Sequence, residues 1–593
     1  MAMNENFDKV KFALGVSEFS EIIDSSCYYC DKTLLIKDLI DNKSKVMLFT
    51  RPRRFGKTLN MTMLRTFFEK PIDGKDTGHY FKNLKIWQQG EKYKSEHGKR
   101  PVIYITFRGI NELTFNAAYD EAVKCVLAEY KRHRELENSK KLHKDDKDFY
   151  KKLAKGKAPY KDWSTSAAEL SRMLCVHHGV QPLILIDEYD APIQSAYIHG
   201  YYEQMITFMR TFLSSAFKDN PYLHTGILTG ITRVSKESIF SGLNNLTVDT
   251  ILDKRFSQYF GLTEEDVKAM LDFYGVPDKM SEVQEWYDGY IFGKREMYNP
   301  WSLINYMANE CVPRDYWANT SANELAGKLI KNMEQDEKQP LYGLLRGKKV
   351  NSSINMNIVY TDLGKDPTLA YGLLAQTGYL KASNAVFELE SYYADLEIPN
   401  KELQSVFSHE IIKRMADDKT RSAAKFLHDS ILQCRPEEMQ EEITSFMLAS
   451  CSYHDLTEEK DYQNLLIGLL GTMRTIYEIK SNRESGHGRS DILLRPKLNV
   501  KNADKMPGII IELKHYKATE EEIKNTEKLE ERLRQEAEEA LRQIDKKDYE
   551  AEILSSGCKK VIKYGAAFSG KKAVIIQPPG QQKPKKKPYE EWG

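Results

Sequence analysis

The sequence lacks both a dominant charge and a long apolar run. It contains 87 lysines and arginines against 86 acidic residues, which gives a net charge of +1 over 593 residues. No overall field therefore attracts nucleic acid, and any such binding needs local basic surfaces. No stretch approaches the about eighteen apolar residues of a membrane-spanning helix, so we expect no membrane partner.

Cysteine is scarce, and no apolar segment precedes a small-residue cleavage site near the N-terminus. The eight cysteines form no framework, which predicts free thiols in a reducing, cytoplasmic setting. Cys27 and Cys30 have the spacing of half a zinc site, but no second pair with suitable spacing follows. Lysine and arginine do cluster locally, at 151–161, 51–54 and 583–587, although most such clusters are only solvated faces.

Two acidic residues and a lysine lie in or beside short apolar runs near the C-terminus. Asp491 stands within 488–494, and Glu512 and Lys514 end the run 509–514. Both runs have strand character, so we expect the three side chains to converge at the rim of one sheet. Carboxylate oxygens suit Mg²⁺, and a bound ion can polarise a phosphoryl oxygen and generate hydroxide. Lys514 would orient the water and offset developing charge.

Glu-x-Lys alone is more often a cross-strand charge pair on a solvated face. Here it is followed by Gln543 on an expected helix, by Tyr549, and by a strand ending at 564–568. This combination resembles the PD-(D/E)xK nuclease superfamily, although the proline of that name is absent before Asp491. The resemblance implies Mg²⁺, with Mn²⁺ as an alternative, and places Gln543 near bound nucleic acid. It also implies a helix-borne glutamate ligand, for which Glu484 is preferred over Glu478.

A phosphate-binding loop follows an apolar strand at 45–49. The order of strand, loop, Gly56-Lys57-Thr58 and helix is that of a P-loop. Backbone N–H groups and a helix N-terminus would face phosphate, Lys57 would reach the β and γ phosphates, and Thr58 would hold Mg²⁺. A plain helix N-cap is the alternative interpretation of these three residues.

This loop departs from the usual pattern at its first glycine, which is replaced by Arg51. Pro52 also removes one N–H that a standard loop offers. We expect weaker nucleotide affinity, partly offset by Arg51, Arg53 and Arg54 near the phosphates.

Two further strands support an ATPase. The run 183–188 ends in Asp187 and Glu188, which predicts that Asp187 holds Mg²⁺ and Glu188 polarises the attacking water. A strand-end turn is the alternative. The run 225–233 offers Thr229, Thr232 and Arg233 as phosphate-sensing candidates.

Other segments extend a resemblance to an AAA-ATPase-like family that occurs with PD-(D/E)xK domains in bacterial proteins. The matching segments are 31–33, 51–58, 185–190, 238–245, 286–290, 298–302 and 316–321. The resemblance reaches from about residue 15 to 321 and resumes from about 373 to 568. It implies that the missing glycine is a family trait, and it places Asp31, Lys32 and Thr33 near the nucleotide.

These patterns predict an α/β protein with several domains, since 593 residues exceed one core. We expect a P-loop NTPase parallel-sheet domain at 1–262 and a helical or winged-helix lid at 263–321. A helix-rich connector would occupy 322–451, an α/β PD-(D/E)xK nuclease-like domain 452–578, and a disordered basic tail 579–593.

The favoured hypothesis is an ATP-binding, ATP-hydrolysing protein that controls a Mg²⁺-dependent nuclease. DNA is preferred to RNA as its partner, a homo-oligomer is left open, and defence against foreign nucleic acid is a guess at its role. The main alternative is an ATP-dependent switch whose nuclease fold only binds nucleic acid. A P-loop phosphotransferase is disfavoured because no acceptor-site signature accompanies the loop.

Overall fold

The chain forms two compact units, which are described separately. The computed structural model describes residues 14–581 with gaps, the longest at 235–245, 318–339 and 408–426. The first unit holds residues 1–337 and 349–404, and the second holds 338–348 and 405–593. The expected connector at 322–451 is thus divided between the units. Most of the expected tail and the motif at 238–245 lie outside the described residues.

A five-stranded parallel sheet is the centre of the first unit, as the sequence predicts. Its strand order is β2 (Val102–Thr106), β3 (Leu183–Asp187), β4 (Thr225–Gly230), β1 (Val46–Thr50) and β6 (Leu246–Asp249). Strands β1 and β3 are buried along their whole length, which explains why they read as continuous apolar runs. Because the strands are parallel, their carboxyl ends meet at one edge of the sheet.

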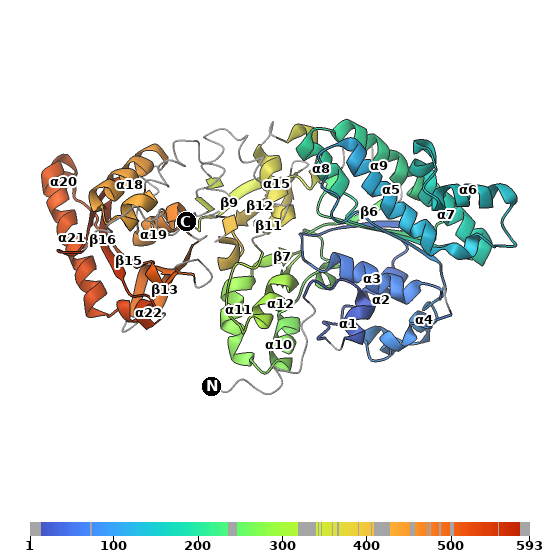
Figure 1. Cartoon of the computed structure of the whole chain (residues 1–593), viewed down its shortest axis with the longest axis horizontal. Helices are drawn as coiled ribbons and strands as arrows, with labels where there is room; N and C mark the ends of the chain where they lie inside the picture. The colour runs from blue at the N-terminus through green and yellow to red at the C-terminus, as the bar shows by residue number, and fades with distance from the viewer. Residues whose placement is uncertain are drawn as a thin grey trace. The chain divides into compact units, whose positions relative to one another are not determined.

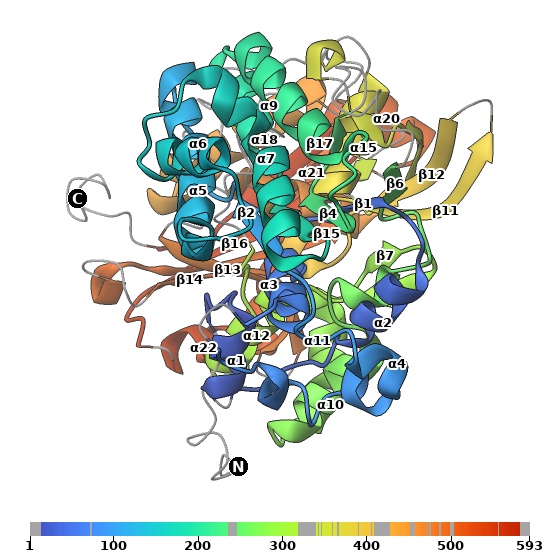
Figure 2. The same ribbon diagram turned by 90° about the vertical axis from the view of Figure 1, so that its right-hand side faces the viewer.

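Helices cover both faces of this sheet (Figure 1). One layer contains α1 (Phe19–Asp24), α2 (Leu34–Asp41), α3 (Lys57–Phe68) and α4 (Glu91–Lys94). The other contains α5 (Phe115–Arg132), α6 (Lys144–Ala154), α7 (Tyr160–His178), α8 (Ala191–His199) and α9 (Tyr202–Phe217). Phe49, Phe67 and Leu185 belong to the core between α3 and the sheet. A quarter turn of the molecule shows α3 directly beneath the strands (Figure 2).

The lid segment combines three helices with a small hairpin. These are α10 (Glu264–Phe273), α11 (Met280–Tyr287), β7 (Tyr290–Phe292), β8 (Arg295–Met297) and α12 (Pro300–Ala308). Thr263 begins α10 through a capping box with Asp266, as its N-cap position predicts. Lys32 forms an ion pair with Asp266 and donates to the carbonyl of Gln258. The side chain of Lys32, which the resemblance places near the nucleotide, thus contacts the start of the lid segment, and a place near the nucleotide remains a prediction.

The prediction of a helix-rich connector is wrong for residues 350–397. This segment contains a three-stranded antiparallel sheet of β9 (Val350–Ile354), β12 (Ser391–Glu397) and β11 (Lys381–Glu388), beside α15 (Pro367–Thr377). In β12 only Ala394 and Leu396 are buried, so the strand carries a short alternating pattern that is weaker than a helical one. Strand β10 (Asn357–Ile358) pairs in parallel with β5 (Arg233–Val234).

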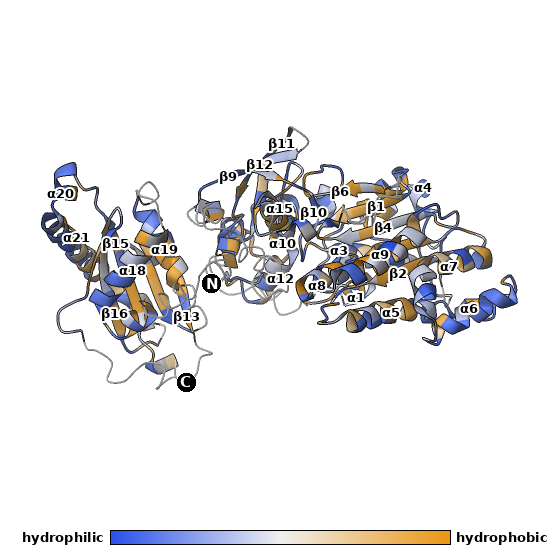
Figure 3. Ribbon diagram, turned by 90° about the horizontal axis from the view of Figure 1, so that it is seen from above, coloured by the Kyte–Doolittle hydropathy of each residue, from blue (hydrophilic) through white to orange (hydrophobic). Residues whose placement is uncertain are grey.

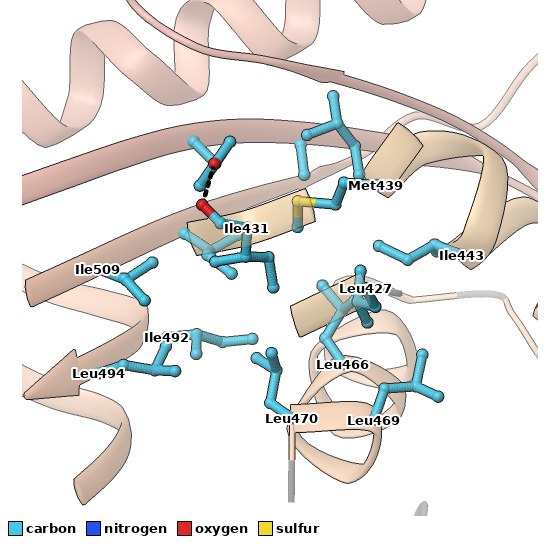
Figure 4. Packing of buried hydrophobic residues seen from close by; sticks show 14 of the residues in the cluster. Leu427, Ile431, Met439, Ile443, Leu466, Leu469, Leu470, Ile492, Leu494 and Ile509 are labelled. Carbon is cyan, nitrogen blue, oxygen red and sulfur yellow. Dashed lines mark hydrogen bonds between the residues drawn. The ribbon is translucent and has the colours of Figure 1, made fainter. Parts of the chain in front are cut away.

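The second unit is built on a mixed five-stranded sheet. The order is β13 (Tyr477–Ser485), β14 (Gly488–Pro496), β15 (Gly508–His515), β16 (Val561–Ser569) and β17 (Lys572–Ile576), with only β15 and β16 parallel. Leu466, Leu469 and Leu470 of the α19 region pack with Ile492 and Leu494 on one face (Figure 4). Helices α18 (Pro436–Ser450) and α19 (Glu459–Leu469) belong to this side.

The opposite face is covered by α21 (Thr526–Lys546) and α22 (Glu550–Ser555), with α20 (Glu520–Lys524) leading into α21. The buried residues of α21 are apolar, whereas its remaining surface is largely hydrophilic (Figure 3). They are Leu529, Leu533, Ala537, Ala540 and Ile544. The charge-rich segment 518–547 is thus an amphipathic helix with a narrow apolar stripe. No described helix of either unit is long and apolar enough to span a membrane.

Gly565 of β16 permits the close approach of α21 to the sheet. A Cβ at this position would meet the carbonyl oxygen of Ala537 and the backbone nitrogen of Leu541. We predict that Gly565→Ala lowers the stability of the second unit by about 1–3 kcal/mol, because the helix backbone must shift. Differential scanning calorimetry of the full chain checks this, with Gly343→Ala as the control, where a Cβ makes only an ordinary contact with Lys348 Cβ at 3.8 Å. Equal transitions for both variants would contradict the close approach.

Candidate functional site

The loop after β1 has the form of an anion cradle. Gly56 lies at φ 76° and begins α3 without a side-chain cap, which leaves backbone N–H groups of the helix N-terminus open to an anion. Lys57 is buried, and its ammonium donates to the carbonyl oxygens of Arg51 at 2.9 Å and Pro52 at 2.8 Å. Burial lowers the pKa of Lys57, while the carboxylates of Glu188 and Asp190 oppose this shift. A buried cation beside an uncapped helix start fits a nucleotide phosphate.

Asp187 joins the loop to two neighbouring strands at the carboxyl edge of the sheet. Its carboxylate accepts hydrogen bonds from the hydroxyls of Thr58 at 2.8 Å, Thr229 at 2.5 Å and Thr106 at 3.3 Å. Asp187 and Thr229 are fully buried. The structure thus brings Thr58, Asp187 and Thr229 together as the sequence predicts, and the hydroxyl and carboxylate oxygens suit Mg²⁺.

Glu188 lies beside this cluster in a strained conformation. Its φ is 51°, in the left-handed region that costs energy for a residue with a side chain. Its backbone N–H donates to the Thr229 hydroxyl at 3.3 Å. Burial raises the pKa of Glu188, and the nearby Lys57 charge opposes the shift. A desolvated carboxylate at the phosphate edge fits the role of polarising a water.

Arg51 does not reach the phosphate site, which corrects the sequence-based expectation. Its side chain is fully buried and forms an ion pair with Asp249 of β6. The guanidinium also donates to the carbonyls of Thr50 at 2.8 Å and Asp249 at 2.9 Å, and lies 5.1 Å from the ring centroid of Phe260. The Arg51 N–H bonds to Gly230, so the strand continues one residue further and the loop turns only after it.

Arg54 also points away from the phosphates, toward the lid. Its guanidinium stacks 4.4 Å from the ring centroid of Trp301 and donates to the carbonyl of Tyr316 at 3.0 Å. Arg53 is different, because its charge acts on Lys57 and Glu188. Of the three arginines, Arg53 is therefore the one whose charge acts at Lys57 and Glu188.

The residues after β4 form a small network rather than a free sensor. Asp190 accepts hydrogen bonds from the N–H of Ile231 and from the N–H and hydroxyl of Thr232, at 2.8–3.0 Å. The Thr232 hydroxyl also lies 3.3 Å from that of Tyr360. Arg233 lies in β5, and its Nε is buried without a hydrogen-bond partner among the described residues. That Arg233 senses the phosphates of a bound nucleotide remains a prediction.

The second cluster joins β14 and β15 of the second unit. The Asp491 N–H donates to Glu512 Oε2 at 3.2 Å, and Asp491 Oδ2 accepts the Leu513 N–H at 2.8 Å. Gln543 of α21 donates to Glu512 Oε1 and accepts from Lys514 Nζ at 2.8 Å. The sequence-predicted Asp491, Glu512, Lys514 and Gln543 are thus brought together, and Gln543 holds the lysine beside the glutamate.

Burial raises the pKa of both carboxylates by more than the neighbouring groups lower it. Burial raises the pKa of Asp491 to about 6, opposed by the Leu513 N–H and reinforced by the charge of Glu459. Burial raises the pKa of Glu512 to about 8, and the Asp491 charge adds to this shift. Two buried acids that compete for protons would gain from a divalent cation, because it removes their mutual repulsion.

Glu459 and Lys547 are site residues that the sequence reasoning missed. Gln463 donates to the Asp491 carbonyl at 2.6 Å, and Glu459 stands one turn earlier on the same face of α19. Lys547 caps the end of α21, four residues after Gln543, and its charge acts on both Asp491 and Glu512. The capping box of Glu458 and Asp461 is a sequence signal that could have located the start of α19.

The preferred ligand Glu484 lies in β13 opposite Arg489, and its side chain is outside the described residues. It is on a strand and not on a helix, contrary to the expected placement. Glu478 pairs with Arg495, which makes it a cross-strand ion pair. Among the described residues, no three metal-binding side chains converge closely enough to hold an ion. The site thus has two assembled carboxylates, and the charge of Glu459 on α19 acts on Asp491.

We predict that Glu512→Gln stabilises the metal-free protein, and more so at high pH. The Glu512 pKa is about 8 in the fold against 4.5 for an ordinary glutamate, so its ionisation penalty is absent below about pH 4 and complete above about pH 8. Stability therefore falls as the pH rises through this window, and the amide removes a penalty on the order of 1 kcal/mol or more. Thermal unfolding in EDTA at pH 5 and pH 8.5 measures this. Glu478→Gln, at a partly exposed position, is the control. A pH-independent difference between Glu512→Gln and the wild type would contradict the buried acid.

Two family models match the parts of the chain that contain the two clusters. Residues 13–240 match the family model described as a predicted AAA-ATPase, and residues 457–578 match that of the PD-(D/E)XK nuclease superfamily. An uncharacterized protein in the vnfD 5' region of Azotobacter chroococcum mcd 1 is 27% identical over 328 residues, or 52% of this chain and 54% of the relative. The chain spans about half the length of this curated relative. The protein described here contains an AAA-ATPase-like domain followed by a domain of the PD-(D/E)XK nuclease superfamily.

Proposed function

We propose that this protein is an ATP-controlled, Mg²⁺-dependent nuclease. The observation that carries the proposal is the assembly of Asp491, Glu512 and Lys514 around Gln543, because it gathers two desolvated acids and a positioned cation. That arrangement suits cleavage of a phosphodiester by a metal-activated water. DNA is the first substrate to test, and defence against foreign nucleic acid is the role we propose for it.

In the ATPase unit, the loop N–H groups and Lys57 would bind the β and γ phosphates. Thr58 and Asp187 would hold Mg²⁺, and Glu188 would accept the proton of the attacking water. Arg53 would add a positive charge at the phosphates. The proposed contribution of Thr229 is to fix Asp187 and the Glu188 backbone, since its hydroxyl contacts both.

In the second unit, Asp491 and Glu512 would hold the metal, joined by Glu459. The ion would supply Lewis-acid polarisation of the phosphoryl oxygen and a more acidic water. Lys514 would orient that water and balance charge in the transition state. Gln543 would keep the lysine in place, because it already bridges Lys514 and Glu512.

Coupling between the activities would run through residues 349–404. This segment touches the nucleotide edge where β10 pairs with β5, and where Tyr360 meets Thr232. It also lies against the loop itself, since a Cβ at Gly378 would meet the Pro52 ring at 2.9 Å. Beyond residue 404 the chain enters the second unit. Binding or hydrolysis of the nucleotide would therefore alter the contacts of residues 349–404, the segment that leads to the nuclease domain.

The second candidate function is a switch that binds nucleic acid without cutting it. It is favoured by the absence, among the described residues, of a complete three-ligand metal site. Cleavage of any substrate that depends on both Asp491 and metal excludes this candidate.

We predict that Lys57→Ala abolishes ATP binding, while Glu188→Gln keeps binding and loses hydrolysis. ATP at about a hundredfold excess over Kd should stabilise the wild type by about 2.7 kcal/mol. Arg53→Ala should weaken this shift, because a charge-assisted phosphate contact is lost.

Arg51→Ala should instead destabilise the fold with or without ATP, since it leaves Asp249 buried and unpaired. Thermal shift and phosphate release measure both effects, and equal ATP affinity of wild type and Lys57→Ala would contradict the assignment.

We predict that Asp491→Asn, Glu512→Gln and Lys514→Ala each reduce cleavage by on the order of a hundredfold or more, while ATP hydrolysis persists. Metal affinity, measured by calorimetry, should fall for the first two only. Glu459→Gln should weaken cleavage most at low Mg²⁺, as expected for a lost ligand.

Glu484→Gln is the matched control for Glu459→Gln. If Glu484→Gln loses cleavage and Glu459→Gln does not, then the strand residue and not the helix residue completes the site. Cleavage that survives every one of these substitutions would belong to another site.

A further inference from the structure

A group of cations without an ion pair among the described residues lies where α6 turns into α7, outside both clusters described above. Lys155, Lys157 and Lys161 are exposed, and they form no ion pair with any described residue. Lys152, just before them, is instead paired with Asp162 at 2.7 Å. Three free ammonium groups within seven residues attract a polyanion, since each can neutralise one phosphate.

Aromatic rings continue this basic turn across the start of α5. Tyr160, the first residue of α7, stacks on Tyr119 with centroids 5.3 Å apart and planes at 23°. Tyr119 in turn stacks on Phe115 at 5.8 Å and 28°. Phe208 supports the row from below, edge-on to Tyr119 at 5.1 Å and to Tyr160 at 5.7 Å.

This row of rings is unusual because it is on the surface. Tyr160 is 44% exposed, and Leu113, just before α5, is 74% exposed. Of the nearby acids, Glu121 and Asp162 form ion pairs with Lys124 and Lys152. Asp120, beside Tyr119, is a further exposed acid. Lys157 and Lys161 flank Tyr160 in sequence, and three residues span at most about 10 Å. Cations and a planar surface thus meet within the reach of one nucleotide.

We propose that this surface, formed by Phe115, Tyr119, Lys155, Lys157, Tyr160 and Lys161, binds single-stranded nucleic acid. The lysines contact the phosphates, and an unpaired base stacks on the exposed ring of Tyr160. A duplex fits less well, because its bases are already stacked on one another and offer no free face. The site lies entirely in the ATPase unit, so it does not depend on the proposed metal site.

Fluorescence anisotropy of the full chain tests this surface. The background variant is Glu512→Gln, and EDTA is present, so cleavage cannot remove the probe. The probes are labelled dT, rU and hairpin duplex of about 20 nucleotides each. We expect single strands to bind more tightly than the duplex, and dT and rU to bind alike, since both offer phosphates and unpaired bases.

Lys155→Glu/Lys157→Glu/Lys161→Glu should weaken single-strand binding and reduce the slope of log K against log salt by about 2. Tyr160→Ala should weaken binding on the order of tenfold with the slope unchanged. The control is Lys43→Glu/Lys75→Glu/Lys82→Glu, which makes the same charge change at exposed lysines elsewhere in the unit. The ATP-induced thermal shift confirms that each variant is folded.

Equal losses for the two triple variants would overturn the proposal, because net charge alone would explain them. Equal binding of duplex and single strand with no effect of Tyr160→Ala would also overturn it. Cleavage by the wild-type protein is measured separately. If nothing is cut and the Tyr160 and lysine effects remain, the surface is supported and the nuclease proposal falls.

Discussion

The buried carboxylate of Asp187 makes the hydrogen bonds on which the AAA-ATPase-like unit depends. It accepts hydrogen bonds from hydroxyls at the ends of β2 and β4 and at the start of α3. An unpaired buried acid would be costly, whereas three donors satisfy it and fix three elements at one edge. The strained Glu188 follows directly, and its N–H is held by the same Thr229 hydroxyl. One carboxylate therefore holds β2, β4 and α3 together at this edge of the sheet.

Two of the three arginines that the sequence analysis expects near the phosphates are used elsewhere in the fold. Arg51 is used inside the fold, where Asp249 and the aromatic rings of Phe260 and Phe292 surround it. Arg54 is used against the lid, over Trp301. The arginine that replaces the usual glycine thus connects the loop to β6, and the loop keeps its left-handed turn at Gly56. Of the cations around the loop, Lys57 and Arg53 are the ones whose charges act beside Glu188.

The second unit relies on the opposite arrangement, because its acids are not fully compensated. Glu512 is almost completely buried and shares its surroundings with Asp491. The only amide side chain that reaches Glu512 among the described residues also holds Lys514. The close approach of α21 at Gly565, which pairs with Glu512 in the sheet, makes that bridge available. The packing of α21 on the sheet therefore also fixes the geometry of the site.

The sequence by itself determined the elements whose signals are local. Continuous apolar runs marked β1 and β3, the Gly-Lys-Thr tripeptide marked the start of α3, and Thr263 marked α10. Asp491, Glu512, Lys514 and Gln543 were also predictable, since two strands and one helix carry them. Only the tertiary structure decided which way a long side chain points, so Arg51 and Arg54 were misplaced. It also decided that the charges of Glu459 and Lys547 act on the acids, because helix docking brings these residues near from 32 residues before Asp491 and 35 residues after Glu512. The sheet at 350–397 escaped notice because its half-buried strands gain their stability from pairing with one another, which no single segment reveals.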